Sequence, residues 1–299
     1  MKGLLPVSGG HNISYEAFGP EDGTVFLSFH GGPGGRSKER DLTFFSQEHR
    51  VILFDQRGCG TSTYENILAE NTTPHLVNDT LDLLDHLNVK RVSLFACSWG
   101  TTLALCFAIA HPERVSSMVL NGVFLGTNEE IHALYDGSLA RFFPETWEYV
   151  RAVAPENVLE RAHAHIGKTD KGLAYEKALF AIERSAKSLS TRWEDVLEEL
   201  DTYAPSPQAV LVPHYFVNGC FLDDEHIIRN AKTLASIPTT IVSGRYDALC
   251  PPRYAHRLAR AIGAELELTV GAHTRREPET ERKLKQAIER HLSPRKIRP

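Results

Sequence analysis

The sequence predicts a doubly wound, mostly parallel α/β sheet that is interrupted by a helical insertion. Two observations carry this prediction. Strand-like and helix-like segments alternate before residue 126 and again after residue 230, whereas the residues between them form amphipathic, charge-rich stretches with almost no strand pattern. A chain of 299 residues is long enough for one large core with an insertion. We therefore expect a core of residues 1–125 and 231–299 and a helical unit of residues 126–230.

The expected sheet follows from short apolar runs. Several of them are continuous, which is the pattern of strands that are buried on both faces of a parallel sheet. The expected strands are Asn12–Phe18, Thr24–His30, Arg50–Asp55, Arg91–Ala96, Ser116–Val123, Thr239–Ser243 and Glu265–Val270.

The expected helices show apolar residues at helical spacing and end at breakers such as His111-Pro112. Those of the core are Pro74–Leu87, Ser98–Ala110, Arg253–Ile262 and Glu279–His291. Those of the insertion are the amphipathic stretches Asn157–His165, Leu173–Ser188 and Arg192–Leu200.

The composition excludes several classes of partner. A formal net charge of −5 gives no reason to expect nucleic acid or an anionic membrane. The segment Met1–Val7 is too short for a signal peptide, and no apolar run approaches the roughly 20 residues of a membrane-spanning helix. Five cysteines at irregular spacing indicate neither a disulfide framework nor a metal site. We expect a cytoplasmic protein, and the sequence leaves its oligomeric state open.

A serine stands where an apolar strand meets a helical stretch. Cys97 and Ser98 follow the expected strand 91–96, with the small residues Ala96 and Gly100 on either side of the segment Cys97–Trp99. Such a strand-to-helix turn exposes a nucleophilic hydroxyl at the top of a sheet. The turn exposes only one side chain, and the spacing to Gly100 selects Ser98. We therefore expect Cys97 to be a packed neighbour.

A glycine-rich turn, His30–Gly35, follows another apolar strand. Free backbone N–H groups in such a turn can stabilise a negative charge that develops on a carbonyl oxygen. We expect the N–H groups of Gly32 and of Trp99, the residue after the serine, to form this oxyanion hole. The adjacent Gly31 is expected to lie against the substrate.

Two downstream turns carry an acid and a base. Asp247 follows the expected strand 239–243, and His273 follows the expected strand 265–270. In this order Ser98 would attack a carbonyl carbon, His273 would act as base and then as acid, and Asp247 would fix the histidine tautomer. Each residue alone has an ordinary structural explanation. Their occurrence in this order, each directly after a strand, indicates a serine hydrolase.

These motifs are similar to those of the proline iminopeptidases (prolyl aminopeptidases), a family of α/β-hydrolase serine peptidases. The resemblance covers nearly the whole chain and implies an α/β-hydrolase fold, a helical cap of residues 126–230, and removal of an N-terminal proline from small peptides without a cofactor. The matching segments are His30–Gly35, Asp55–Ser62, Asn71–Thr73, Ser98–Leu105, His111–Val115, Gly244–Asp247, Cys250-Pro251, Phe143–Glu148 and His214–Phe216.

The resemblance also implies a site for the free amino group of a substrate, which that family forms with two glutamates of the cap. Glu183 corresponds to the first, although Leu179 and Ile182 stand where the family has tryptophan. Val212 stands in place of the second, and one missing carboxylate costs about 2–3 kcal/mol of ammonium binding. We expect Tyr215 to line the cap pocket, with a place in the core as the alternative.

Three other functions remain open. The apolar residues Leu179, Ile182 and Val212 favour an esterase, lactonase or amidase that acts on a less charged acyl group. The same site could transfer an acyl group to an acceptor other than water if the cap excluded water. A non-catalytic ligand-binding protein could also keep this fold, although an ordered triad argues against it. In each case the expected partner is a small molecule or a short peptide.

Overall fold

The computed structural model describes residues 1–166 and 169–291. Residues 167–168 of the expected helical unit and residues 292–299 of the expected core lie outside the described residues. The strands are β1 (Lys2–Val7), β2 (His11–Phe18), β3 (Thr24–Phe29), β4 (His49–Phe54), β5 (Thr63–Tyr64), β6 (Val92–Cys97), β7 (Val115–Asn121), β8 (Thr239–Gly244) and β9 (Glu265–Thr269).

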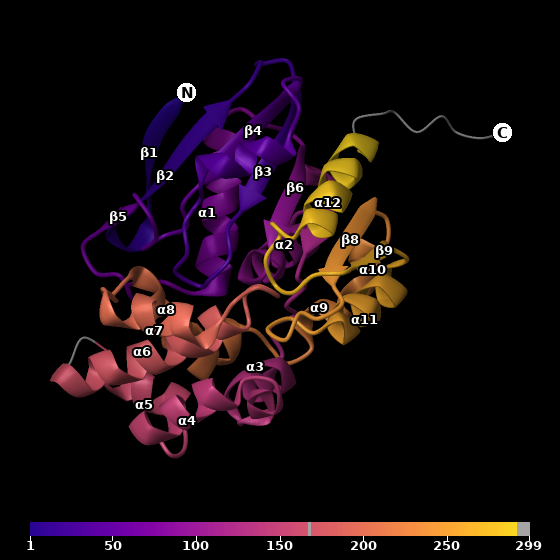
Figure 1. Ribbon diagram of the computed structural model, residues 1–299. Coiled ribbons are helices and arrows are strands. Elements are labelled where there is room, and N and C mark those ends of the chain that lie inside the picture. The colour runs from indigo at the N-terminus through magenta and orange to yellow at the C-terminus, as the bar shows by residue number, and fades with distance from the viewer. Residues whose placement is uncertain (167–168, 292–299) are drawn as a thin grey trace.

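Within the described part of the chain these strands form one twisted sheet in the order β1-β2-β4-β3-β6-β7-β8-β9 (Figure 1). The pairs from β4 to β9 are parallel, whereas β2 pairs antiparallel with β1, β4 and β5. From β3 the chain crosses to β4 on one side and then returns to β6 on the other side of β3. The connections that leave the carboxyl ends of β3 and β6 therefore run in opposite directions, and such a switch point is where open α/β sheets bind ligands.

Four helices belong to the sheet layers: α1 (Thr73–His86), α2 (Trp99–Ala110), α11 (Pro252–Ile262) and α12 (Pro278–Arg290). The chain between β7 and β8 holds the other α-helices of the described residues. They are α3 (Asn128–Tyr135), α4 (Pro144–Val153), α5 (Val158–Ala164), α6 (Thr169–Ser185), α7 (Trp193–Asp201), α8 (Pro207–Val217), α9 (His226–Arg229) and α10 (Ala231–Leu234). Helices α3 to α8 lie together below the sheet in the view of Figure 1.

The sequence predictions for the core agree with these elements to within two residues at each strand end. The edge strands β1 and β5 are missing from the predictions. Strand β1 contains Gly3 and Pro6 and is only partly buried, and β5 has just two residues, so neither shows an apolar run. Helices α3, α4, α8 and α10 are also missing from the predictions. Helix α8 is mostly buried and contains Pro213, so its sequence does not show one apolar and one polar face.

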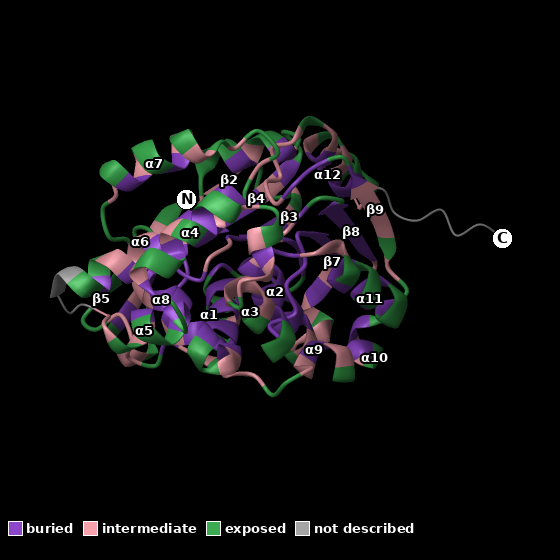
Figure 2. Ribbon diagram, turned by 60° about the horizontal axis from the view of Figure 1, so that its bottom comes forward, coloured by how far each residue is buried: buried purple, intermediate pink, exposed green. Residues whose placement is uncertain are grey.

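The sheet has a core on each face, because successive side chains of a strand point to opposite sides. Figure 2 shows the strands as a buried layer between helices with exposed outer surfaces. The smaller core lies against α12 and contains Phe26, Phe95, Val119, Val242, Leu284 and Ile288. The larger core lies against α1, α2 and α11 and takes the alternate strand residues Leu27, Leu94, Leu120 and Ile241. The central strands are therefore apolar on both faces, as the continuous runs in the sequence predict.

Helix α2 approaches the neighbouring strand β3 very closely. A Cβ atom added at Gly100 would lie 2.5 Å from the carbonyl oxygen of Phe29 and 2.8 Å from that of His30. Only glycine fits this contact without a backbone shift. The first turn of α2 is therefore held against the end of β3.

Among the described residues, no helix has the length and apolarity needed to cross a bilayer.

A buried ion pair joins the loop after β4 to helix α1. Arg57 is 1% exposed, and its guanidinium donates to both carboxylate oxygens of Asp79, at 2.5 and 2.7 Å. Nη1 of Arg57 donates a further hydrogen bond to the carbonyl oxygen of Glu70, at 2.8 Å. A bidentate pair with this additional acceptor satisfies a guanidinium that is cut off from water.

We expect Asp79→Leu to lower the free energy of unfolding by about 3–5 kcal/mol, because it leaves a buried guanidinium without its carboxylate. Urea denaturation measures this change. The matched control is the double variant R57M/D79L, which removes both charges and is expected to recover a large part of the loss. A double variant less stable than D79L would contradict this account of the pair.

Candidate active site

Ser98 occupies the turn between β6 and α2. Its backbone has φ 55° and ψ −132°, a conformation that residues other than glycine rarely adopt. The Ser98 N–H donates to the carbonyl oxygen of Asn121 at the end of β7, at 3.0 Å. This bond and the close packing of Gly100 hold the serine at the carboxyl edge of the sheet. Cys97 also lines the adjacent cavity, and its sulfur accepts a hydrogen bond from Arg275 at 3.3 Å.

The glycine-rich turn after β3 is fixed by a buried hydrogen-bond network through Gln56. Its side-chain amide donates to the carbonyl oxygen of His30 at 3.0 Å, and its side-chain oxygen accepts from the Trp99 indole at 2.9 Å. The Gln56 backbone N–H donates to Nε2 of His30 at 3.0 Å, while Nδ1 of His30 lies 2.8 Å from the carbonyl oxygen of Gly31. The sequence analysis missed Gln56, although it lies in the quoted segment Asp55–Ser62.

The protonation of His30 agrees with this network. Burial lowers the pKa of His30 below its ordinary value, and it outweighs the hydrogen bond to Gly31, which raises the pKa. The imidazole is therefore neutral, with Nδ1–H donating to Gly31 and Nε2 accepting from Gln56. A neutral ring adds no positive charge to the turn, and it donates one hydrogen bond and accepts another.

Gly32 and Trp99, whose backbone N–H groups are expected to form the oxyanion hole, line the same cavity as Ser98. Gly32 has φ 137°, a conformation reserved for glycine, and it lines the same cavity as Ser98. Trp99 is the first residue of α2, so its N–H has no acceptor within the helix. Gly31 lines the cavity as well, and a Cβ atom added there would lie 3.2 Å from Cβ of Ser98.

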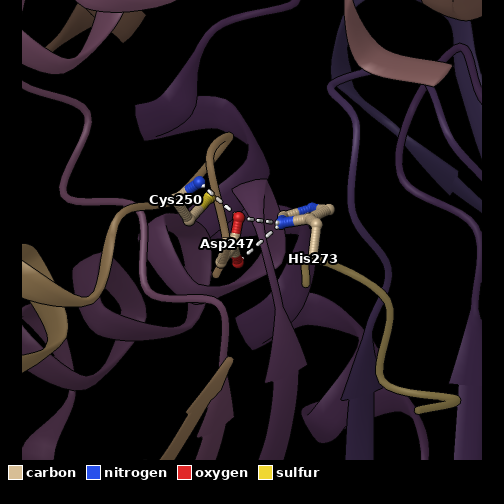
Figure 3. Close-up of side chains that lie close together, drawn as sticks. All are labelled: Asp247, Cys250 and His273. Carbon is tan, nitrogen blue, oxygen red and sulfur yellow. Dashed lines mark hydrogen bonds and ion pairs between the residues drawn. The ribbon is translucent and has the colours of Figure 1, made fainter. Parts of the chain in front are cut away.

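Asp247 and His273 meet at the carboxyl ends of β8 and β9 (Figure 3). Nδ1 of His273 lies 2.9 Å from Oδ2 and 3.1 Å from Oδ1 of Asp247. Oδ1 also accepts hydrogen bonds from the backbone N–H groups of Leu249 and Cys250, at 3.0 and 2.8 Å. The carboxylate is 3% exposed. These bonds fix its direction, so that Nδ1 of His273 carries the proton and Nε2 stays free to act as a base.

The charge of Asp247 sets the basicity of His273. Burial lowers the pKa of His273, but the negative charge of Asp247 and its hydrogen bond raise it, and the charge of Glu183 adds to them. The net result is a pKa above the ordinary value of 6.5. An imidazolium formed at this position is therefore stabilised, as a base that accepts a proton requires.

Asp247, Cys250 and His273 also offer three potential metal-ligand atoms within 4.8 Å of one another. Burial, together with the charges of Asp247 and Glu130, raises the pKa of the Cys250 thiol well above its ordinary value. The thiolate is the form that binds a metal ion, so a neutral Cys250 is a poor ligand. Figure 3 shows instead that Asp247 accepts hydrogen bonds from Nδ1 of His273 and from the backbone N–H of Cys250.

A cavity of about 550 Å³ opens beside Ser98 and His273. This volume suits a small ligand or a short peptide. Glu183 and Val212, both singled out in the sequence, line it, and so do the apolar residues Leu179 and Ile182. The carboxylate of Glu183 accepts a hydrogen bond from the side-chain amide of Gln208 and lies 3.9 Å from the ammonium of Lys187.

Tyr215 does not line this cavity, contrary to the expectation from the sequence. It is 1% exposed and packs edge-on against Trp99, with ring centroids 4.8 Å apart. Its hydroxyl donates to Oδ1 of Asn71 at 2.7 Å. Helix α8 directs Tyr215 toward the core loop before α1, so the core alternative is the correct one. The residue supports Trp99 from behind.

Glu176 is a second carboxylate in the cavity, and the sequence analysis missed it. It lies on α6 two turns before Glu183, and its Oε2 is buried without a hydrogen-bond partner among the described residues. Burial raises the pKa of Glu176. Burial also raises the pKa of Tyr203 to about 12, and the charges of Glu176 and Glu183 add to this shift. Both carboxylates are therefore near one hydroxyl, and their spacing of seven residues could have indicated a shared helix face.

Comparisons with known proteins agree with this fold and site. The α/β hydrolase fold family matches residues 24–273 of the chain. Solved structures of a proline iminopeptidase-related protein of Thermus thermophilus and of a thermophilic esterase of Thermogutta terrifontis share the fold. Their TM-scores are 0.62 and 0.67 at 21% and 20% identity, they cover 98% of this chain, and the match spans 96% and 100% of their own chains. The protein is therefore an enzyme of the α/β-hydrolase class.

More similar sequences define the family within that class. The proline iminopeptidase of Arabidopsis thaliana is 38% identical over 287 residues, which span 92% of this chain and 76% of the plant protein. The proline iminopeptidase of Neisseria gonorrhoeae is 36% identical over 297 residues, which span 96% and 94% of the two chains. The chain belongs to the proline iminopeptidase family of serine hydrolases.

The pKa values of the two histidines of the site are expected to be shifted in opposite directions. In an NMR titration of labelled imidazoles we expect the pKa of His273 above 6.5 and that of His30 below it. Asp247→Asn removes the charge that raises the pKa of His273, so this pKa falls while that of His30 stays unchanged. A His273 titration that does not move in D247N would show that Asp247 does not control its basicity.

Proposed function

We propose that this enzyme removes an N-terminal prolyl or similar small aminoacyl residue from short peptides, through an acyl-enzyme formed on Ser98. The observation that carries the proposal is one cavity that contains a serine, a base and two carboxylates, namely Ser98, His273, Glu176 and Glu183. A nucleophile and two carboxylates on one wall of the same cavity suit a substrate with an amide bond next to a free ammonium group.

In the proposed mechanism, Nε2 of His273 takes the proton of the Ser98 hydroxyl while its oxygen attacks the carbonyl carbon of the first residue. The oxyanion that forms accepts hydrogen bonds from the N–H groups of Gly32 and Trp99. Asp247 holds the imidazole through Nδ1 and stabilises its positive charge. The imidazolium then protonates the leaving amine nitrogen, and the carbon–nitrogen bond breaks.

The second half of the reaction uses the same groups. A water molecule loses a proton to Nε2 of His273 and attacks the acyl-enzyme carbonyl, and the proton returns to the Ser98 oxygen as the acid leaves. The histidine must be neutral for the first step. Because its pKa is raised, activity is expected to fall as the pH falls through a value above 6.5.

We infer that Glu183 and Glu176 together recognise the ammonium group of the substrate. Glu183 is held by Gln208, whereas Glu176 keeps a buried oxygen without a partner among the described residues. An ammonium group placed near both would satisfy that oxygen. In this account Glu176, at a different position in the cap, replaces the carboxylate that is missing at Val212.

We also propose that residues 126–230 act as the cap of this site. Two contacts support a cap that is attached next to the histidine: the Thr274 N–H donates to the carbonyl oxygen of Lys187 at 2.8 Å, and the Ser188 hydroxyl donates to Glu277 at 2.9 Å. Helix α8 is joined to the core through His214, whose Nε2 lies 2.9 Å from the carbonyl oxygen of Asn71. A cytoplasmic location stays a prediction from the sequence.

A second candidate function is hydrolysis of esters or amides with an uncharged acyl group. The observation that favours it is the apolar wall formed by Leu179, Ile182 and Val212, all buried at the cavity. Such a wall binds a proline ring and a small aliphatic acyl chain equally well. The two candidates therefore differ only in whether the substrate needs an ammonium group.

Turnover of proline 4-nitroanilide and of a short-chain 4-nitrophenyl ester separates them. We expect the wild type to cleave the prolyl anilide efficiently and Ser98→Ala to lower kcat by at least about 1000-fold on both substrates. A sulfonyl fluoride should label the wild type at Ser98 and leave S98A unlabelled. Ester cleavage without prolyl cleavage would reject the peptidase proposal in favour of the esterase.

The role of the two glutamates has its own test. We expect Glu176→Gln and Glu183→Gln each to lower kcat/KM for proline 4-nitroanilide by about 10- to 150-fold, because each removes one charged partner of the ammonium. Hydrolysis of the uncharged ester should change little. Glu160→Gln, an exposed glutamate on α5, is the matched control. Equal losses on both substrates would indicate a structural role instead.

A further inference from the structure

More cationic than acidic side chains line the cavity beside Ser98. Among the described residues, the acidic side chains that line it are Glu176 and Glu183. The cationic side chains that line it are Arg36, Lys38, Arg40, Lys187, Arg275 and Arg276. The chain as a whole has a formal net charge of −5, so this excess is local. An amine-binding site alone does not account for it, since cations repel an ammonium group.

Part of this positive charge is already paired. Arg275 and Arg276 contact the buried carboxylate of Asp41, at 2.5 and 3.2 Å. Arg276 also lies 3.4 Å from Glu281. Lys187 has only a long contact with Glu183, at 3.9 Å. The two arginines therefore belong to a structural cluster, while Lys187 is weakly compensated.

The remaining cations have no such compensation. Within residues 1–166 and 169–291, no ion pair involves Arg36, Lys38 or Arg40. Partial burial lowers the pKa of Lys38, and the neighbouring charges of Arg40 and Lys187 lower it further. Lys38 is thus close enough to Arg40 and Lys187 for their charges to repel one another, although all three residues are exposed. A bound anion would relieve this repulsion.

The acidic and the unpaired cationic groups come from different parts of the site. Glu176 and Glu183 lie on α6, whereas residues 36–40 directly follow the glycine-rich turn that contains Gly32. That turn is the expected oxyanion hole, so the cations begin four residues from a group that contacts the reacting carbonyl. A substrate with an ammonium group at one end and an anionic group beyond the scissile bond matches this separation of charge.

We propose that Arg36, Lys38 and Arg40 form a subsite for a carboxylate on the leaving-group side of the scissile bond. The preferred substrates are then short peptides in which the released part is anionic. The carboxylate has two sources with the same chemistry: the side chain of an acidic second residue, or the free C-terminus of a dipeptide. This inference rests on the proposed aminopeptidase function.

The test compares matched peptides that all begin with proline. Pro-Glu-NH₂ against Pro-Gln-NH₂ isolates the side-chain carboxylate, and Pro-Ala against Pro-Ala-NH₂ isolates the C-terminal carboxylate. We expect kcat/KM to be about 3- to 10-fold higher for the anionic member of at least one pair at low ionic strength, and this ratio to fall as salt is added.

The variants identify the residues responsible. In K38M/R40M the ratio of kcat/KM between anionic and neutral peptides should approach one. The matched control is Lys232→Met, since this exposed lysine on α10 lies outside the cavity lining and its loss should leave the ratio unchanged. If the double variant does not fold, the single variants K38M and R40M replace it. Each is expected to lower the ratio of kcat/KM between anionic and neutral peptides by part of the full amount. A ratio of one in the wild type, or a ratio that K38M/R40M does not change, overturns the inference and leaves the peptidase proposal intact.

Failure of the peptidase proposal is recognised separately. If the wild type does not cleave any prolyl substrate, the subsite is tested through inhibition of Ser98-dependent ester hydrolysis. N-acetylglutamate should then inhibit the wild type about 3- to 10-fold more strongly than N-acetylglutaminamide, and K38M/R40M should abolish the difference. Equal inhibition by the two compounds would overturn the inference in this case as well.

Discussion

The close approach of α2 to the end of β3 is the constraint on which the site depends. Because Gly100 has no side chain, the first turn of α2 lies directly against the carbonyl groups of Phe29 and His30. This contact places the serine turn after β6 beside the glycine-rich turn after β3, at the point where the winding of the sheet reverses. The proposed nucleophile and the proposed backbone N–H donors are therefore neighbours as a result of main-chain packing. The hydrogen bonds of Gln56 to His30 and Trp99 then orient the two turns that this packing brings together.

The charges of the cavity divide into three groups with different surroundings. Asp247 is fixed by backbone N–H groups and by His273, and it controls the basicity of that histidine. Asp41 neutralises Arg275 and Arg276 and joins the loop after His273 to the segment after the glycine-rich turn. The remaining charged groups, on α6 and on residues 36–40, are incompletely paired. Groups that are fully paired maintain the structure, and groups with unused capacity are the ones available to a ligand.

The sequence predicts the central sheet well, because parallel strands buried on both faces have continuous apolar runs. Segments without that pattern are missing: β1 is partly exposed at an edge, and α8 is apolar all round with a proline inside. The site is predictable from the same strand pattern. Ser98, Asp247 and His273 each follow a strand in the chain, so their positions along the sequence indicate a common edge of the sheet.

The strand pattern of the sequence does not predict residues whose role depends on packing between distant segments. Glu176 reaches the cavity because of how α6 is placed, and apart from its seven-residue spacing to Glu183 its local sequence does not distinguish it from the exposed acids between β7 and β8. Tyr215 stands in a motif that resembles the family, yet α8 directs it to Asn71 and behind Trp99. Gln56 is visible in the sequence as part of a motif, but its partners His30 and Trp99 are assigned only by the fold.

The wide spacing of the reactive groups along the chain has a consequence for biosynthesis. Ser98 and its oxyanion donors lie in the first part of the chain, whereas Asp247 and His273 follow β8 and β9, beyond the helices of residues 128–234. A nascent chain can therefore form the strained serine turn long before a base exists to activate it. Strand β8 must then pair with β7, and β9 with β8, and such long-range parallel pairing is slow. The proposed triad is therefore incomplete until the last strand of the sheet has joined.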